Sequence, residues 1–290
     1  MASSKTLVCG KFKLELGLRT HIMGILNRTQ DSFSDGGLFF DEKRAVEHAL
    51  KMAADGADII DIGGESTRPG AERISVDEEL RRVMPLIERL VPVLSIPISI
   101  DTTKAEVARE ALKAGASIVN DITGLHGDPE MARVVAAANA PVIIMHMQGD
   151  PRTMQQNPAY IDLIGELKDF FEYSIDLAKG SGIDPEKILL DPGIGFGKTV
   201  EHNLEIIKRL DEFKDLGRPI VIGTSRKSFI GKVLDADVDK RLIGTAATCA
   251  AAILRGADII RVHDIEEMLQ VAKMVDSIKE GTIKKDRPIL

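Results

Sequence analysis

One short pattern recurs three times in this chain and constrains its fold more than any other feature. Gly56-Ala-Asp-Ile-Ile, Gly115-Ala-Ser-Ile-Val and Gly256-Ala-Asp-Ile-Ile each follow a segment of helical periodicity and open an apolar, β-branched run. Such runs are typical of buried parallel strands, and glycine suits the position just after a helix. The recurrence therefore predicts a repeated helix–strand unit.

Further apolar runs bring the predicted strands to about eight, and helical segments alternate with them. An alternation of this kind over 290 residues predicts an α/β fold, a (β/α)8 TIM barrel, for which about 250 residues are typical. A doubly wound open sheet is the alternative, but its glycine fingerprint after the first strand is missing. The predicted strands are 21–27, 57–63, 97–101, 141–146, 188–191, 220–223 and the two that open after Gly115 and Gly256; the predicted helices are 41–55, 76–90, 104–114, 129–138, 160–179, 200–210, 238–255 and 265–280.

The first twenty residues have a different pattern from the rest. Residues 6–19 alternate loosely around Gly10, which predicts a short hairpin that plugs one end of the domain. We therefore divide the chain into an N-terminal hairpin (1–20) packed on the barrel, a (β/α)8 barrel (21–281) and a C-terminal tail (282–290).

Charge and cysteine content restrict the partners and the compartment. The formal charge is −7, which argues against non-specific nucleic-acid binding, because that needs a basic face. Cys9 and Cys249 are too far apart in sequence to suggest a disulfide framework or a zinc site, so we expect a reducing cytoplasm. No window approaches the ~18 consecutive apolar residues of a membrane span, and we expect no membrane partner.

Polar residues stand at the end of every predicted strand. In a barrel the C-terminal ends of all strands converge on one mouth, where active sites lie. We therefore expect these side chains to form one site. They are Asn27, Asp61, Glu65, Asp101, Asn120, Asp121, His146, Asp191, Thr224, Ser225, Arg226, Lys227, Arg261, His263 and Asp264.

The stretch 220–231 combines a strand end with two adjacent cations. The apolar run breaks at Gly223, continues to Arg226 and Lys227, and reaches Ser228, which we predict to be a helix N-cap. Cations beside a helix start favour an anionic ligand. A nearby Gly197-Lys198-Thr199 resembles the end of a P-loop, but Pro192 stands where that motif needs glycine, so we reject an ATPase.

The predicted mouth combines cations with acids. Arg68, Lys227, Arg261 and, if protonated, His263 predict a phosphate or pyrophosphate ligand. Two carboxylates there accept paired N–H donors from a guanidine-like heterocycle edge, and an amide offers both a donor and an acceptor to the same ring; these are Asp101, Asp191 and Asn120. The residues thus predict a polar heterocycle that carries an anionic group.

These residues fall in motifs that resemble the dihydropteroate synthase family of pterin-binding barrels. The resemblance covers about residues 21–280 and implies a TIM-barrel transferase of folate biosynthesis. In its reaction, p-aminobenzoate displaces pyrophosphate from (7,8-dihydropterin-6-yl)methyl diphosphate and gives 7,8-dihydropteroate. The motifs are Met23-Gly-Ile-Leu-Asn27, Asp31-Ser-Phe-Ser-Asp-Gly-Gly37, Asp61-Ile-Gly-Gly-Glu-Ser-Thr-Arg-Pro-Gly70, Ser99-Ile-Asp101, Asn120-Asp121, Asp191-Pro-Gly-Ile-Gly-Phe196, Gly223-Thr-Ser-Arg-Lys-Ser228 and Arg261-Val-His263.

The resemblance also implies roles for individual residues. Asp101, Asn120, Asp191 and Lys227 would hold the pterin, with Met145 and Phe196 walling its faces, and Gly223 would be a further substrate-binding residue. Thr67, Asn27, Arg68, Arg261 and His263 would take the diphosphate, and Phe33, Thr67, Pro69 and Ser228 would shape the p-aminobenzoate site. Asp35, on a loop, would act in catalysis with Lys227, Arg261 and His263. Mg²⁺ on Asn27 is the implied cofactor, and a cytoplasmic homodimer that sulfonamides target is the implied assembly.

One departure from the family pattern keeps alternatives open. Arg28 and Gln30 stand where the family usually has an apolar residue and a proline. Loss of the proline loosens the loop, and Arg28 either adds a cation beside the diphosphate or points into solvent. A pterin-binding homologue with weakened or lost synthase activity is therefore one alternative, and a methyltetrahydrofolate methyltransferase is a less favoured one. A ligand-free scaffolding barrel is the third.

Overall fold

Eight parallel strands form the barrel in the computed structural model, which describes residues 5–28, 38–67 and 70–283. The strand order is β8-β7-β6-β5-β4-β3-β10-β9, and a single parallel bridge between Leu190 and Ile220 joins the two ends. This confirms the predicted (β/α)8 barrel. The barrel strands are β3 (His21–Asn27), β4 (Ile59–Gly63), β5 (Ile98–Asp101), β6 (Ile118–Asp121), β7 (Val142–Met145), β8 (Ile188–Asp191), β9 (Val221–Ile222) and β10 (Ile259–Val262).

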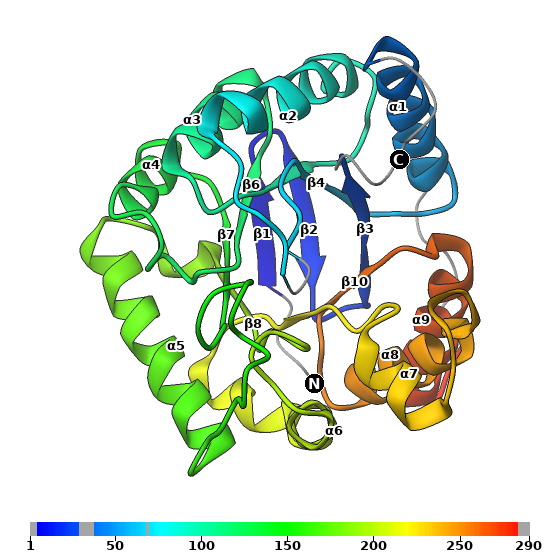
Figure 1. The fold of residues 1–290 in the computed structure, drawn as a ribbon. Coiled ribbons are helices and arrows are strands. Elements are labelled where there is room, and N and C mark those ends of the chain that lie inside the picture. Colours follow the sequence, from blue (N-terminus) through cyan, green and yellow to red (C-terminus); the bar gives the residue numbers. More distant parts are fainter. Residues whose placement is uncertain (1–4, 29–37, 68–69, 284–290) are drawn as a thin grey trace.

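The helices surround the strands as an outer ring (Figure 1). Their inward faces and the outward faces of the strands share one continuous apolar core. The α-helices are α1 (Leu38–Ala54), α2 (Val76–Leu90), α3 (Ala105–Ala114), α4 (Met131–Ala137), α5 (Leu163–Gly180), α6 (Val200–Lys208), α7 (Ser228–Leu234), α8 (Leu242–Leu254) and α9 (Ile265–Glu280), and the 3-10 helices are η2 (Pro185–Lys187), η3 (Leu210–Leu216) and η4 (Val238–Lys240).

The glycine of each recurring pattern makes the turn from helix to strand. Gly56, Gly115 and Gly256 have φ values of 104°, 113° and 101°, a region that other residues rarely adopt. At Gly115 a side chain would also collide with Val91, because a Cβ there would lie 2.8 Å from a Val91 methyl carbon. The repeat is thus a set of equivalent helix ends, as predicted.

The N-terminal hairpin closes the bottom of the barrel. Strands β1 (Lys5–Cys9) and β2 (Phe12–Leu16) pair antiparallel, and Figure 1 shows them within the ring of helices. The inward residues of the hairpin form a second apolar cluster with one residue from the lower part of each of seven barrel strands. The cluster is Leu7, Cys9, Leu14, Leu16, Met23, Ile59, Ile118, Ile143, Leu189, Val221 and Ile259.

Three predicted boundaries were wrong in ways that matter for the site. Ser228 is the first residue of α7, and Lys227 is the N-cap, so the predicted cap is shifted by one position. The predicted helix 238–255 is η4 followed by α8, because the chain turns at Arg241 before α8 begins. The predicted helix 200–210 ends at Lys208, after which the chain tightens into η3.

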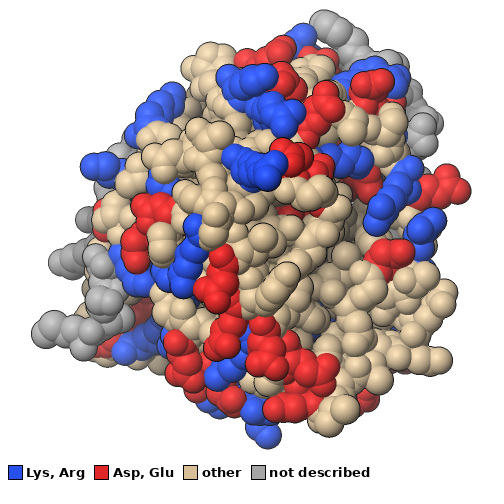
Figure 2. All heavy atoms as spheres, turned by 90° about the vertical axis from the view of Figure 1, so that its left-hand side faces the viewer, with Lys and Arg blue, Asp and Glu red and all other residues tan. Residues whose placement is uncertain are grey.

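The outer surface is mixed in charge. Figure 2 shows the side of α3, α4 and α5, where acidic and basic side chains lie interspersed. Within residues 5–28, 38–67 and 70–283, no helix combines the length and apolarity that crossing a bilayer requires.

Candidate active site

Strand register assembles one row of polar groups at the mouth of the barrel. Asn27 on β3 is paired with Gly63 on β4, Gly63 with Asp101 on β5, and Asp101 with Asn120 on β6. The glycine keeps this row open, because a Cβ at Gly63 would lie 3.1 Å from Asn27 Oδ1 and 3.5 Å from Asp101 Cβ. Residues predicted from four separate motifs therefore lie side by side, as expected for a barrel mouth.

Arg261 is the ionic centre of the site. Its Nε donates to Asp61 Oδ2 at 2.6 Å and its Nη2 to Asp101 Oδ2 at 2.8 Å, while Asn120 Nδ2 donates to the same Asp61 oxygen at 3.2 Å. Burial raises the pKa of Asp101 to about 7, although Arg261 opposes this. The second guanidinium terminus, Nη1, has no partner within the described part of the chain and is available to a ligand.

Asp191 and Lys227 are two further ionisable groups at the mouth, and each influences the pKa of the other. Asp191 ends β8 and accepts a hydrogen bond from Gly193 N at 2.7 Å. Burial raises the pKa of Asp191, and this N–H, Lys227 and Arg261 act against the rise. Burial, with Arg261 nearby, lowers the pKa of Lys227 to about 8, and its Nζ lies 4.1 Å from the centre of the Phe196 ring.

An apolar wall stands beside these charges. Met145, at the end of β7, and Phe196, on the loop after β8, are both buried in one small cluster with Ile122 and Met154. A flat aromatic ligand stacks well on such a surface. The two predicted wall residues thus contribute to one shared cluster.

His263 was predicted to join the cations only if protonated, and its surroundings favour the neutral form. Burial lowers the pKa of His263 to about 4, and Arg261 and Arg226 add to this effect. Ser225 Oγ accepts from His263 N at 3.3 Å and lies 2.9 Å from His263 Nδ1. We assign the serine proton to Nδ1, which leaves the hydrogen on Nε2. A neutral imidazole in this tautomer donates a hydrogen bond to an anion without adding charge.

Lys198 is a buried residue that sequence reasoning missed. It is 2% exposed, and its Nζ lies 2.9 Å from His146 Nδ1 and donates to Phe196 O at 3.0 Å and His146 O at 3.3 Å. Burial lowers its pKa to about 7. Lys198 therefore ties the end of β7, beside Met145, to the loop that carries Phe196. The rejected P-loop resemblance drew attention to this lysine for the wrong reason.

Arg28 does not point into solvent, which was one of its two predicted positions. Its side chain is 8% exposed and donates from Nη1 to Arg82 O on α2 at 2.8 Å. The guanidinium therefore contacts the helix layer and does not point into solvent. Asp61, noted only as a strand end, is the acid that completes the Arg261 cluster.

The remaining predicted site residues fall into two groups. Phe33, Asp35, Arg68 and Pro69 lie outside the described residues, as does Gln30. Thr67 is half-buried after β4, Gly223 follows β9, and the exposed Ser228 opens α7. The site described above therefore consists of strand-end residues and of residues on the loops that follow β8 and β9.

The predicted metal position is compatible with magnesium but offers few ligands. Asn27 is exposed at the end of β3, and its Oδ1 faces the space that Gly63 leaves open. No group of three or more His, Cys, Asp or Glu side chains suited to a metal occurs among residues 5–28, 38–67 and 70–283. Mg²⁺ usually keeps several waters and binds through one or two protein oxygens plus phosphates, so a single amide oxygen fits such an ion.

Comparison with known proteins agrees with this geometry. The model of the family "Pterin binding enzyme" matches residues 23–263. Dihydropteroate synthase of Synechocystis is 54% identical over 273 residues, 94% of each chain. The Clostridium difficile dihydropteroate synthase structure determined with pteroic acid is 54% identical, has a TM-score of 0.87 and covers 91% of this chain and 98% of its own. The Xanthomonas albilineans enzyme with 4-aminobenzoic acid is 41% identical, has a TM-score of 0.90 and covers 96% and 99%.

The family model spans most of the strands that build the mouth, and the relatives match nearly from end to end. The chain therefore belongs to the pterin-binding enzyme family, among the dihydropteroate synthases.

Proposed function

We propose that this chain condenses p-aminobenzoate with (7,8-dihydropterin-6-yl)methyl diphosphate to give 7,8-dihydropteroate and pyrophosphate. The observation that carries this proposal is the meeting of buried acids with an apolar wall and two cations in one mouth. The relatives support it, since two of them have structures with pteroic acid or 4-aminobenzoic acid.

The acids suit the pterin ring. A pterin presents a guanidine-like edge of N–H donors, which Asp191 is placed to accept with its Oδ2 while its Oδ1 accepts from Gly193 N. Asn120 lies in the same mouth, one strand from Asp101. The shared cluster of Met145 and Phe196 provides the apolar surface for the ring face.

The donors suit the leaving group. In the reaction the bond between the pterin methylene carbon and the diphosphate oxygen breaks, the amine nitrogen of p-aminobenzoate bonds to that carbon, and the nitrogen loses a proton. In this proposal, Arg261 Nη1, the Lys227 ammonium and His263 Nε2–H would stabilise the negative charge that develops on the diphosphate. Asn27 Oδ1 would hold Mg²⁺, which supplies further charge neutralisation when bound.

The direct test is pyrophosphate release from the pterin diphosphate in the presence of Mg²⁺, measured with and without p-aminobenzoate. Release that depends on p-aminobenzoate and yields dihydropteroate supports the synthase. Thermal stabilisation by the pterin without release would instead favour the weakened homologue. Methyl transfer from methyltetrahydrofolate would favour the methyltransferase.

The pH profile of kcat/KM for the pterin diphosphate should be bell-shaped. Lys227 is charged below its pKa of about 8 and neutral above it, so capture of the diphosphate should fall as pH rises past about 8. Asp101 becomes protonated below its pKa of about 7, so the rate should also fall below that pH. The measurement is initial rate at saturating p-aminobenzoate from pH 5.5 to pH 10, roughly the window where such side chains titrate. In a Lys227→Met variant, kcat/KM should no longer fall above about pH 8, the pKa of Lys227. If the fall at alkaline pH persists in that variant, we would assign it to Lys198 instead.

Replacing Lys198 with methionine should raise KM for the pterin diphosphate about tenfold and change kcat less. The substitution leaves Phe196 O and His146 O without their donor, and each lost buried hydrogen bond costs about 1–3 kcal/mol. KM for p-aminobenzoate should stay within about twofold, because the loss of Lys198 loosens the Met145 and Phe196 wall, which we assign to the pterin. Lys208→Met on the exposed side of α6 is the matched control. Equal rises in both KM values would indicate general loss of structure instead.

We further propose a homodimer built on the face of α6, α7 and α8. Adjacent helices there expose large apolar side chains, among them Leu204 on α6, Val233 and Leu234 on α7, and Ile243 on α8, which is 76% exposed. An apolar face of this kind favours association. Sedimentation of the protein at micromolar concentration tests it.

We also propose that sulfonamides inhibit the protein, since sulfonamides resemble p-aminobenzoate in shape. We propose a cytoplasmic location as well, in line with two buried free cysteines in the described part of the chain.

A further inference from the structure

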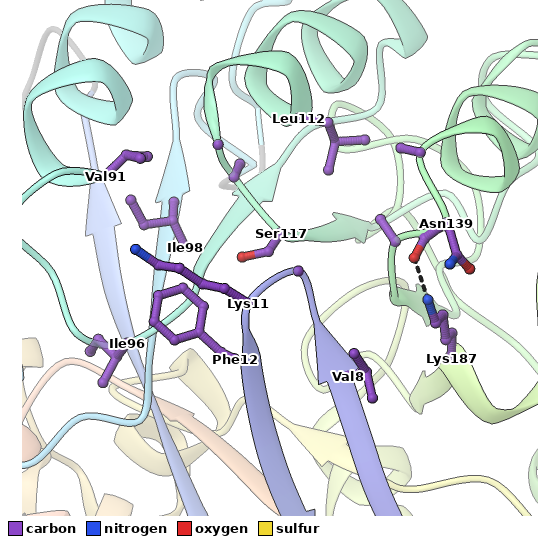
Figure 3. A pocket seen from close by; sticks show the side chains of 15 residues that line it. Val8, Lys11, Phe12, Val91, Ile96, Ile98, Leu112, Ser117, Asn139 and Lys187 are labelled. Carbon is purple, nitrogen blue, oxygen red and sulfur yellow. Dashed lines mark hydrogen bonds between the residues drawn. The ribbon is translucent and has the colours of Figure 1, made fainter. Parts of the chain in front are cut away.

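A second hollow lies at the opposite end of the barrel from the mouth. It is a cavity of about 470 Å³ between the tip of the N-terminal hairpin and the N-terminal ends of β5, β6 and β7. We call it the hairpin-tip cavity. Figure 3 shows Lys11 and Phe12 of the hairpin facing Val91, Ile96, Ile98 and Ser117 across it. Its volume is within the ~300–1,000 Å³ of sites for small molecules.

A buried hydroxyl in this cavity lacks a partner. Ser117, just before β6, is 7% exposed, and its Oγ makes no hydrogen bond within the described part of the chain. The hairpin turn lies directly over it, because a Cβ at Gly10 would be 3.5 Å from Ser117 Cβ. Figure 3 shows the hydroxyl pointing to the side of the cavity where Lys11 and Phe12 lie. Leaving such a group unpaired costs about 1–3 kcal/mol, so a polar ligand atom beside it is favoured.

The charges that line the cavity are all positive. Lys11 and Lys187 line it, and no Asp or Glu of the described residues does. Lys187 Nζ donates to Asn139 O and is held on the far side of the hairpin tip (Figure 3). Lys11 Nζ lies 5.0 Å from the centre of the Phe12 ring and forms no ion pair with a described residue. An anionic ligand in the cavity would therefore meet the Lys11 ammonium on the same side as the Ser117 hydroxyl.

The remaining walls are apolar. Val91, Ile96 and Ile98 bound the same side of the cavity as Ser117, and the Phe12 ring closes it from the hairpin. A compact hydrocarbon body fits these walls, whereas a multiply charged ligand such as a nucleotide would leave most of its charge unmatched. One anionic group on a small apolar body is the chemistry that the lining matches.

We propose that the hairpin-tip cavity is a binding site for a small monocarboxylate with an apolar body, whose carboxylate accepts hydrogen bonds from Ser117 Oγ and Lys11 Nζ. The site is separate from the barrel mouth, since its lining lies at the opposite ends of the strands. Because the ligand would bridge the hairpin and the barrel, it would also stabilise their contact.

The test is a titration of the full chain, with methyl-labelled Ile, Leu, Val and Met, by cyclohexanecarboxylate, followed by NMR. Cyclohexanecarboxamide, which has the same shape without the charge, is the matched probe. We expect saturable shifts at Ile96, Ile98 and Val91, with a Kd of about 1 mM or tighter. The carboxamide should bind about tenfold more weakly, as expected for loss of charge-assisted hydrogen bonds.

Variants separate this site from non-specific binding. Lys11→Met should reduce the preference for the carboxylate to about twofold or less, and Ser117→Ala should weaken binding about fivefold. Lys13→Met, an exposed lysine on the same hairpin, should change neither. Shifts confined to the Met145 methyl group would place the probe at the mouth and overturn the proposal. No saturable shift, or equal binding of both probes, would mean that the cavity holds only water.

Discussion

Replacing Arg261 by alanine should lower kcat/KM for the pterin diphosphate by about 10²–10³, the usual effect of removing one donor to a developing oxyanion. It should also reduce the free energy of unfolding by about 3–5 kcal/mol, because breaking a buried ion pair leaves uncompensated charge. Asp61 is fully buried and the side chain of Asp101 is 9% exposed, and both lose their guanidinium partner. Steady-state kinetics and urea denaturation measure the two effects.

Two further variants give this prediction its controls. Arg255→Ala removes an exposed arginine whose ion pair with Asp211 is 3.3 Å long, and it should change stability by about 1 kcal/mol or less. Arg261→Lys keeps the positive charge, but an ammonium group cannot donate to both carboxylates in the planar geometry of a guanidinium. Relative to Arg261→Ala, it should therefore restore the free energy of unfolding more than kcat/KM. A folded Arg261→Ala protein whose kcat/KM stays within about threefold of the parent would show that Arg261 has only a structural role.

The second large effect is expected from Asp191→Asn. The asparagine keeps an oxygen for Gly193 N but replaces the ligand-facing acceptor with an amide. The affinity for the pterin should fall about 10- to 100-fold, which is the cost of about 1.5–3 kcal/mol for losing hydrogen bonds to a charged group. Calorimetric titration with 6-hydroxymethyl-7,8-dihydropterin measures the pterin alone, without the diphosphate. The fold should survive, because burial of the charge is relieved.

Asp215→Asn is the matched control for this substitution. Asp215 is 77% exposed and pairs only with Lys168 at 3.0 Å among the described residues, so its replacement should leave pterin affinity unchanged. If Asp191→Asn leaves the affinity unchanged, the guanidine-like edge of the pterin binds to another acid. Asp101→Asn would then be the variant to measure.

The alternative of a weakened homologue has less structural support than its sequence motivation suggested. Arg28 donates to Arg82 O and is buried against α2, so its side chain is held by the helix layer and is not free in solvent. The donors Lys227, Arg261 and His263 are all present at the mouth. Gln30 lies outside the described residues, and the assay with p-aminobenzoate decides its effect.

The amino-acid sequence by itself determined the barrel and the composition of its mouth. Strands β3 and β8 and helices α2 and α9 have the predicted bounds, because apolar periodicity and glycine helix ends are local properties. Polar residues at successive strand ends could be assigned to one mouth, since all parallel barrels bring those ends together. The family motifs added roles to single residues.

Only the tertiary structure decided which of these groups touch and which are charged. Arg261 and Asp61 are 200 residues apart in sequence, so their contact depends on strand register, which no local pattern encodes. Whether His263 carries a charge was left open by the sequence, and burial favours its neutral form. Lys198 was set aside with the P-loop motif, and the structure shows it buried between the end of β7 and the loop that carries Phe196. The hairpin-tip cavity likewise depends on how a turn at Gly10 meets β6. Contacts between distant segments and exclusion of water arise only when the chain is folded, and they set the chemistry of this site.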